Sequence, residues 1–148
     1  MLSRVLAERY SAGVRAGLIS VAATSGVLVA FGLGSGSVTR PFLFLGQHLG
    51  SYRDVTTPQT AVILAGLLLH AAWIIAWCVA FSLVALDARP WTRIPLALVT
   101  VAIAFLASSR IIGSALDYSG IGGARWVLLH LVFAITLYKG TRFAPVGY

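Results

Sequence analysis

The longest apolar stretch of the chain runs from Ala61 to Leu86 and holds 26 residues without a charged side chain. About 20 apolar residues are enough for a helix to cross the hydrocarbon core of a bilayer. We therefore expect a transmembrane helix over residues 60–86. His70 is the most polar side chain inside this stretch, so a central question is which groups His70 faces.

Three further apolar runs are long enough to cross the same core. The first, Ala16–Leu33, has 18 residues and follows a basic start. It is longer than the apolar region of a typical signal peptide, so we expect a retained span over residues 14–34. The other two runs predict spans over residues 94–116 and 122–139.

Two shorter segments predict helices that do not cross the membrane. Residues 1–10 place three apolar side chains on one helical face, which predicts a short helix on the membrane surface. Between the first two spans, Thr39 can cap a helix that has Pro41 in its first turn. Residues 41–52 are too few to span the bilayer, so we expect an interfacial or re-entrant helix there.

The whole pattern predicts an all-α integral membrane protein. It would be a single domain, a bundle of four transmembrane helices with one short interfacial or re-entrant helix between the first and second spans. Composition agrees, because 59% of the 148 residues are apolar and 10% are charged, whereas a soluble domain carries about a quarter charged residues. Cys78 is the single cysteine and lies within a span, so we expect a small core residue.

The basic residues divide unequally between the two predicted sides of the membrane. Seven lie on the side of the termini, namely Arg4, Arg9, Arg15, Arg89, Arg93, Lys139 and Arg142. Four lie on the other side or near it, namely Arg40, Arg53, Arg110 and Arg125. Because cytoplasmic loops carry the excess of Arg and Lys, we expect a bacterial inner-membrane protein with both termini in the cytoplasm.

The net charge of +7 therefore indicates membrane lipids as partners, since basic residues that flank apolar runs anchor anionic headgroups. We do not expect nucleic acid as a partner.

Small residues recur at a spacing of four along the first span. Gly13 and Gly17 form one such set, and Ala22, Gly26 and Ala30 form another. Such faces let a second helix approach closely, so we expect both sets to pack against other helices.

Four ionisable side chains lie in or near the spans, and such residues in a membrane are functional candidates. His70 and His130 are predicted at comparable depths, with Arg110 and Arg125 toward the outer side. Two imidazoles on two helices are a ligand set for haem b, with the arginines placed for its propionates. The layout resembles membrane b-type cytochromes in principle.

Each of these residues also has a structural interpretation. His70 would hydrogen-bond to Thr100 or Ser109 on a neighbouring helix. Arg110 would pair with Asp117 or reach the outer headgroups, and Arg125 would anchor the outer mouth of the fourth span.

Apolar and aromatic residues supply candidate contact surfaces. Phe42, Phe44 and Leu45 of the interfacial helix are expected at the headgroups or in contact with a partner. Trp73 and Trp77 share a helix face with His70 and would either line a pigment or quinone pocket or pack against lipid or a partner helix. Trp126 is expected in an interfacial aromatic belt.

Together these features favour a non-catalytic accessory subunit of a larger membrane complex, of the respiratory or photosynthetic kind, in contact with lipids and other integral subunits. The alternative is a haem b electron carrier that uses His70 and His130, and a third hypothesis is a small transporter. Proton-coupled carriers usually depend on acids within their spans, and Asp117, near a span end, is the only acid there. No catalytic motif is present, so we do not expect an enzyme.

Overall fold

The computed structural model describes residues 2–49, 58–85, 88–112 and 123–142, and within these ranges the chain is helical with no strand. The helices are α1 (Leu2–Gly34), α2 (Arg40–Leu49), α3 (Gln59–Ala85), α4 (Pro90–Ile112) and α5 (Gly123–Arg142). This confirms the all-helical prediction.

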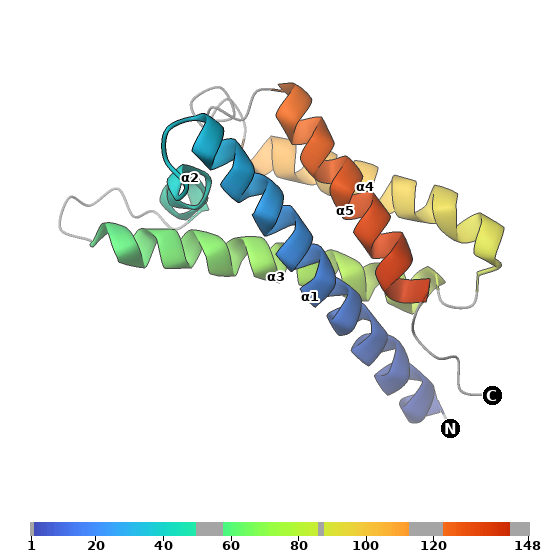
Figure 1. Ribbon diagram of the computed structural model, residues 1–148. Helices are drawn as coiled ribbons and strands as arrows, with labels where there is room; N and C mark the ends of the chain where they lie inside the picture. Colours follow the sequence, from blue (N-terminus) through green and yellow to red (C-terminus); the bar gives the residue numbers. More distant parts are fainter. Residues whose placement is uncertain (1, 50–57, 86–87, 113–122, 143–148) are drawn as a thin grey trace.

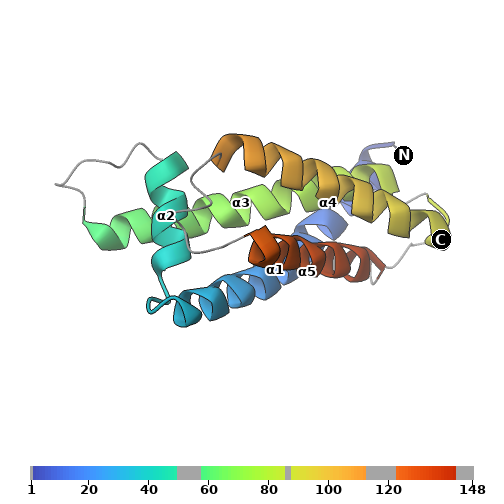
Figure 2. The ribbon, with the colours of Figure 1, turned by 90° about the horizontal axis from the view of Figure 1, so that it is seen from above.

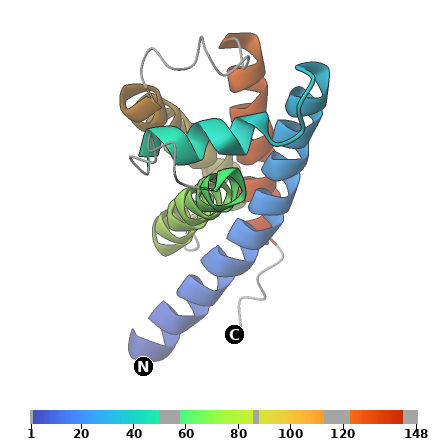
Figure 3. The ribbon, with the colours of Figure 1, turned by 90° about the vertical axis from the view of Figure 1, so that its left-hand side faces the viewer.

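α1 and α5 lie side by side and cross α3 obliquely, α4 packs against both α3 and α5, and the short α2 lies across α3 (Figures 1 and 2). Figure 3 shows α2 lying over one end of α3. α1 begins, α3 ends, α4 begins and α5 ends at the same end of the bundle (Figure 1). The long helices therefore alternate in direction along the chain.

Three helices are long and apolar enough to cross a membrane, over Ser3–Gly34, Gln59–Ala85 and Trp91–Ile111. Their outward faces expose large apolar side chains, as at Leu68 of α3 and Leu106 of α4. α5 is more polar, because Arg125, His130 and Lys139 lie within its 20 residues. Three of the four predicted spans therefore have the length and apolar composition of a helix that could cross a membrane.

The predicted helix bounds differ from the structure most at the N-terminus. The separate surface helix expected over residues 1–10 is wrong, because residues 2–10 continue into the first span as one helix of 33 residues. No proline occurs before Pro41, so no residue blocks the continuation.

At the other helices the differences are small. α4 begins at Pro90 rather than at residue 94, since proline is well accommodated in a first helical turn. α5 continues to Arg142. The predicted helical residues 50–52, 86, 113–116 and 122 lie outside the described residues.

α1 and α3 approach closely where α1 carries its first pair of glycines. A Cβ atom at Gly13 would lie 2.6 Å from the Cα atom of Val79, and one at Gly17 would lie 3.0 Å from the Cα atom of Ile75. This confirms the predicted packing role of the two glycines. Ala22, Gly26 and Ala30 lie on an exposed part of the helix, so the packing of this second set against another helix stays a prediction.

Polar side chains also join α1 to α3. The Ser82 hydroxyl donates to the Arg9 carbonyl oxygen at 2.9 Å. The Cys78 thiol donates to the Ser20 hydroxyl at 3.7 Å, and Cys78 is fully buried, as expected for a core residue.

α2 and α3 cross at two glycines, one on each helix. A Cβ atom at Gly46 would overlap the carbonyl oxygen of Val62, and one at Gly66 would overlap that of Phe42. Because the atoms in the way belong to the backbone, a larger residue at either site must push the helices apart. The crossing brings the aromatic side chains of α2 against the bundle.

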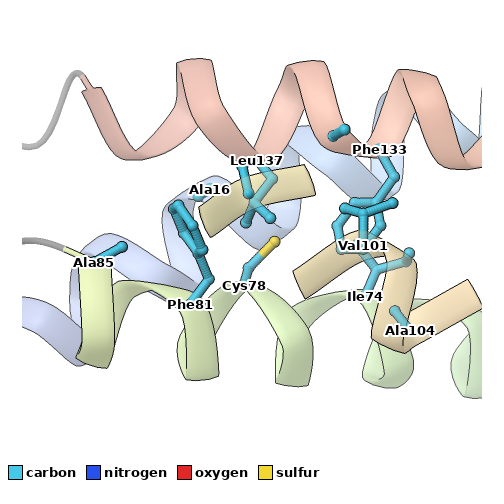
Figure 4. Close-up of a cluster of buried hydrophobic side chains, with 11 residues drawn as sticks. Ala16, Ile74, Cys78, Phe81, Ala85, Val101, Ala104, Phe133 and Leu137 are labelled. Atoms are coloured by element: carbon cyan, nitrogen blue, oxygen red, sulfur yellow. The ribbon is translucent and has the colours of Figure 1, made fainter. Parts of the chain in front are cut away.

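The buried apolar side chains form two clusters. In the larger one, Ile74 of α3, Val101 of α4 and Phe133 of α5 converge (Figure 4). The smaller one contains Leu28, Phe42, Phe44, Trp126 and Leu129. The candidate site lies between these clusters.

Candidate functional site

A cavity of about 400 Å³ lies between the two clusters, within the usual range of small-molecule sites. All five helices contribute to it. Its walls are Thr24, Leu28, Phe44, Leu45, Leu69, His70, Ala72, Trp73, Ile74, Ala76, Ser108, Ile111, Trp126, Leu129, His130 and Phe133. None of these side chains is charged at neutral pH except by protonation of an imidazole, so the cavity is an apolar chamber with a few polar groups.

His70 is held by the neighbouring helix α1. Its Nε2 atom lies 2.9 Å from the Thr24 hydroxyl oxygen, and that hydroxyl lies 2.7 Å from the Ser20 carbonyl oxygen one helical turn earlier. The Phe42 ring meets the imidazole edge-on, with ring centroids 6.4 Å apart. His70 is 8% exposed, so this histidine has a fixed position in the cavity wall.

His130 is held by its own helix and by two aromatic rings. Its Nδ1 atom lies 2.9 Å from the Trp126 carbonyl oxygen. The Trp126 ring lies 4.8 Å from the imidazole and the Phe105 ring 5.0 Å, both edge-on. The hydrogen bond and the rings together orient the imidazole, as backbone carbonyls do for ligating histidines elsewhere.

The structure brings five of the predicted site residues to this one cavity, namely His70, His130, Phe44, Leu45 and Trp73. The expectation that the two histidines lie in one layer is therefore supported by a shared cavity. The expected hydrogen bond from His70 to a neighbouring helix is present, but its partner is Thr24 of α1. Thr100 and Ser109, the partners suggested from the sequence, donate to carbonyls of their own helix.

The two arginines do not line the cavity. Arg110 and Arg125 are exposed, and the Arg125 guanidinium lies 5.7 Å from the centre of the Phe31 ring, within cation–π range. Asp117, the expected partner of Arg110, lies outside the described residues. In the described part of the chain, no arginine or lysine side chain therefore lines the cavity, and none is in position to pair with a haem propionate.

The aromatic residues of α2 and α3 pack within this chain. Phe42 and Phe44 are buried in the smaller cluster, with Leu45 packed against it. Trp73 and Trp77 meet edge-on at 5.7 Å and pack against the larger cluster. Contact of these five residues with a second protein stays a prediction.

Among the cavity residues that were not predicted from the sequence as site residues, Thr24, Ser108 and Trp126 carry polar side-chain atoms. Trp126 was expected in an aromatic belt but is 7% exposed and forms a cavity wall. Its position one helical turn before His130 was the available signal, because residues four apart share a helix face. Thr24 and Ser108 gave no such signal, because their role depends on how helices pack.

One polar group of the cavity wall has no hydrogen-bond partner in the described ranges, because the indole nitrogen of Trp126 is buried and unpaired. The Ser25 hydroxyl is also buried and unpaired, but Ser25 does not line the cavity. Among the residues that the structure describes, no group of three or more His, Cys, Asp or Glu side chains is arranged to hold a metal ion.

Comparison with protein-family models, curated proteins and solved structures finds no match to this chain.

Proposed function

We propose that this protein is a non-catalytic accessory subunit of a larger membrane complex, and that it holds a neutral apolar molecule in the cavity between His70 and His130. The observation that carries the proposal is the cavity itself. It is large enough for a small molecule, apolar over most of its wall, and free of charged residues. Such a chamber favours an uncharged occupant.

The proposal places the chain in a bacterial inner membrane with four spans and both termini in the cytoplasm. Three helices have the length and apolar composition for this. α5 would be the fourth span, with Arg125 and Lys139 near its ends at the two headgroup layers. α1 begins and α5 ends at the same end of the bundle (Figure 1), which agrees with both termini on one side of the membrane.

The outward face of α4 is the surface we propose for a neighbouring subunit. α4 is the least buried of the three candidate spans. Leu98, Val99, Ile103 and Leu106 leave at least half of their surface exposed there. Because α4 packs inward through small or short residues, such as Ala97 and Ala104, its outer face is available for a transmembrane helix of another integral subunit.

A photo-crosslinking amino acid placed at Val99 tests this assignment in intact membranes. We expect a discrete crosslink to one integral membrane protein, and native mass spectrometry in mild detergent should show the same protein bound. The same amino acid at Leu68, an exposed position of the neighbouring helix α3, serves as the control. Crosslinks only to lipid at Val99, together with a single chain in the mass spectrum, would contradict the accessory role.

A haem b carrier is the second candidate, because both imidazoles face one cavity and the Nδ1 atom of His130 is held by a carbonyl. That contact leaves Nε2 as the atom that would bind iron. The exposed positions of Arg110 and Arg125 do not add to this candidate. A visible spectrum decides it, since haem gives a Soret band and a reduced α-band, and haem reconstitution without either band ends it.

The third hypothesis, a small transporter, has no observation in its favour. The cavity does reach the two histidines, but apolar walls favour an apolar occupant over a column of water. We therefore do not propose transport.

A further inference from the structure

The hydrogen bonds of the two histidines assign the proton on each imidazole. A carbonyl oxygen only accepts hydrogen bonds, so the Nδ1 atom of His130, 2.9 Å from the Trp126 carbonyl oxygen, must carry the hydrogen. We take the imidazole as neutral, because no acidic side chain lines the cavity. A neutral imidazole has one N–H group, so His130 Nε2 holds a bare lone pair.

The same reasoning applies to His70 through Thr24. The Thr24 hydroxyl has a single hydrogen, and it donates this hydrogen to the Ser20 carbonyl oxygen at 2.7 Å. The hydroxyl oxygen must then accept from His70 Nε2, which lies 2.9 Å away. His70 Nδ1 is therefore also a bare lone pair, and among the described residues neither lone pair has a hydrogen-bond partner.

The lone pair on His130 Nε2 sets the chemical requirement for a ligand. A hydroxyl group meets this requirement, because it donates its hydrogen to the imidazole. A carbonyl or ether group offers no hydrogen and leaves the imidazoles unpartnered.

The walls restrict the rest of the ligand. Four aromatic side chains line the cavity, namely Phe44, Trp73, Trp126 and Phe133. Aromatic rings pack favourably edge-on or offset against other flat rings. No charged side chain is present to pair with an ionic head group.

We infer that the cavity binds an uncharged aromatic alcohol, of the phenol or hydroquinone class, whose hydroxyl hydrogen is accepted by His130 Nε2. This inference rests on the proposed function only in treating the cavity as a binding site. It does not depend on a partner subunit.

The test uses the full chain in lipid nanodiscs and two matched probes, 2-naphthol and its methyl ether. The ether has nearly the same shape and keeps an acceptor oxygen but lacks the donated hydrogen. We expect saturable naphthol binding about fivefold tighter than ether binding, which is the typical effect of one neutral hydrogen bond. In His130→Phe, the two probes should bind within about twofold of each other.

Nitrogen-15 spectra of the labelled histidines give a second measurement. The resonance of His130 Nε2 should shift when naphthol binds and stay in place with the ether. Thr136→Val is the control on the same helix, because the Thr136 hydroxyl bonds only to carbonyls of α5, and it should keep the fivefold preference.

Three results would overturn the inference. The first is equal binding of the two probes to the unaltered chain. The second is a preference for naphthol that survives in His130→Phe, together with a His130 Nε2 resonance that naphthol does not shift in the unaltered chain. The third is a Soret band in the purified protein. Loss of the naphthol preference with the Val99 crosslink intact would reject this inference alone. A naphthol preference that is kept while the Val99 crosslink is absent would reject only the accessory role.

Discussion

The hydrogen bond between Thr24 of α1 and His70 of α3 should contribute measurably to stability, and its removal provides a sharp test of the site. In Thr24→Val a methyl group replaces the hydroxyl with little change of volume, so packing is kept. The His70 N–H group then loses its 2.9 Å acceptor in a buried setting. Side-chain hydrogen bonds between membrane helices are worth about 0.6 kcal/mol on average and up to about 1.7 kcal/mol.

A double-mutant cycle isolates this pair. Thr24→Val should lower the free energy of unfolding by about 1 kcal/mol. In a His70→Phe background the same change should cost less, by a coupling energy of about 0.6–1.7 kcal/mol. Unfolding in mixed micelles with increasing sodium dodecyl sulfate, followed by circular dichroism, supplies the four free energies.

The matched control is Thr136→Val, whose hydroxyl bonds only within α5. It should change the unfolding free energy by less than about 0.5 kcal/mol. A Thr24–His70 coupling energy below about 0.3 kcal/mol, which is the level of independent sites, would refute the proposed contact and with it the proton assignment on His70.

Two further predictions concern the packing and the orientation of the chain. Gly66→Ala should be less stable than Gly26→Ala by about 1–3 kcal/mol in the same assay, because a Cβ atom at Gly66 overlaps a backbone carbonyl of α2 whereas one at Gly26 meets nothing within 4 Å; equal stabilities would contradict the α2–α3 crossing. Cys78 is fully buried, so a membrane-impermeant maleimide should not label the folded protein. In a Cys78→Ala background, Ser3→Cys should be labelled only from the cytoplasmic side and Ser37→Cys only from the opposite side; labelling of both from one side would contradict the proposed topology.

The sequence was sufficient for the helices because each long apolar run needs its backbone hydrogen bonds satisfied locally in a membrane. It was also sufficient for Gly13 and Gly17, which pack against α3 as expected. It could not show that Gly26 faces away from the other helices of this chain, because small residues at the same spacing occur on two faces of α1 and the spacing does not tell which face packs within the chain.

The candidate site could be predicted only in part. His70 and His130 were recognisable because imidazoles are costly in a membrane, and their shared cavity follows from comparable depth in a bundle. Thr24 could not be found, because its role arises where α1 crosses α3 and no local pattern encodes that crossing. Arg110 and Arg125 were placed by depth alone, and depth does not say whether a side chain points inward.

The central claim is that the cavity holds a neutral molecule, and the most direct measurement is of what the purified protein contains. Small molecules extracted from the protein should be compared by mass spectrometry with those from Ala72→Trp. Ala72 lines the cavity, so the larger side chain should occupy part of the cavity volume. Leu68→Trp, at an exposed position of the same helix, is the control. We predict a near-stoichiometric neutral aromatic alcohol in the unaltered protein and the control that is lost from Ala72→Trp. Identical extracts from all three proteins would contradict the account.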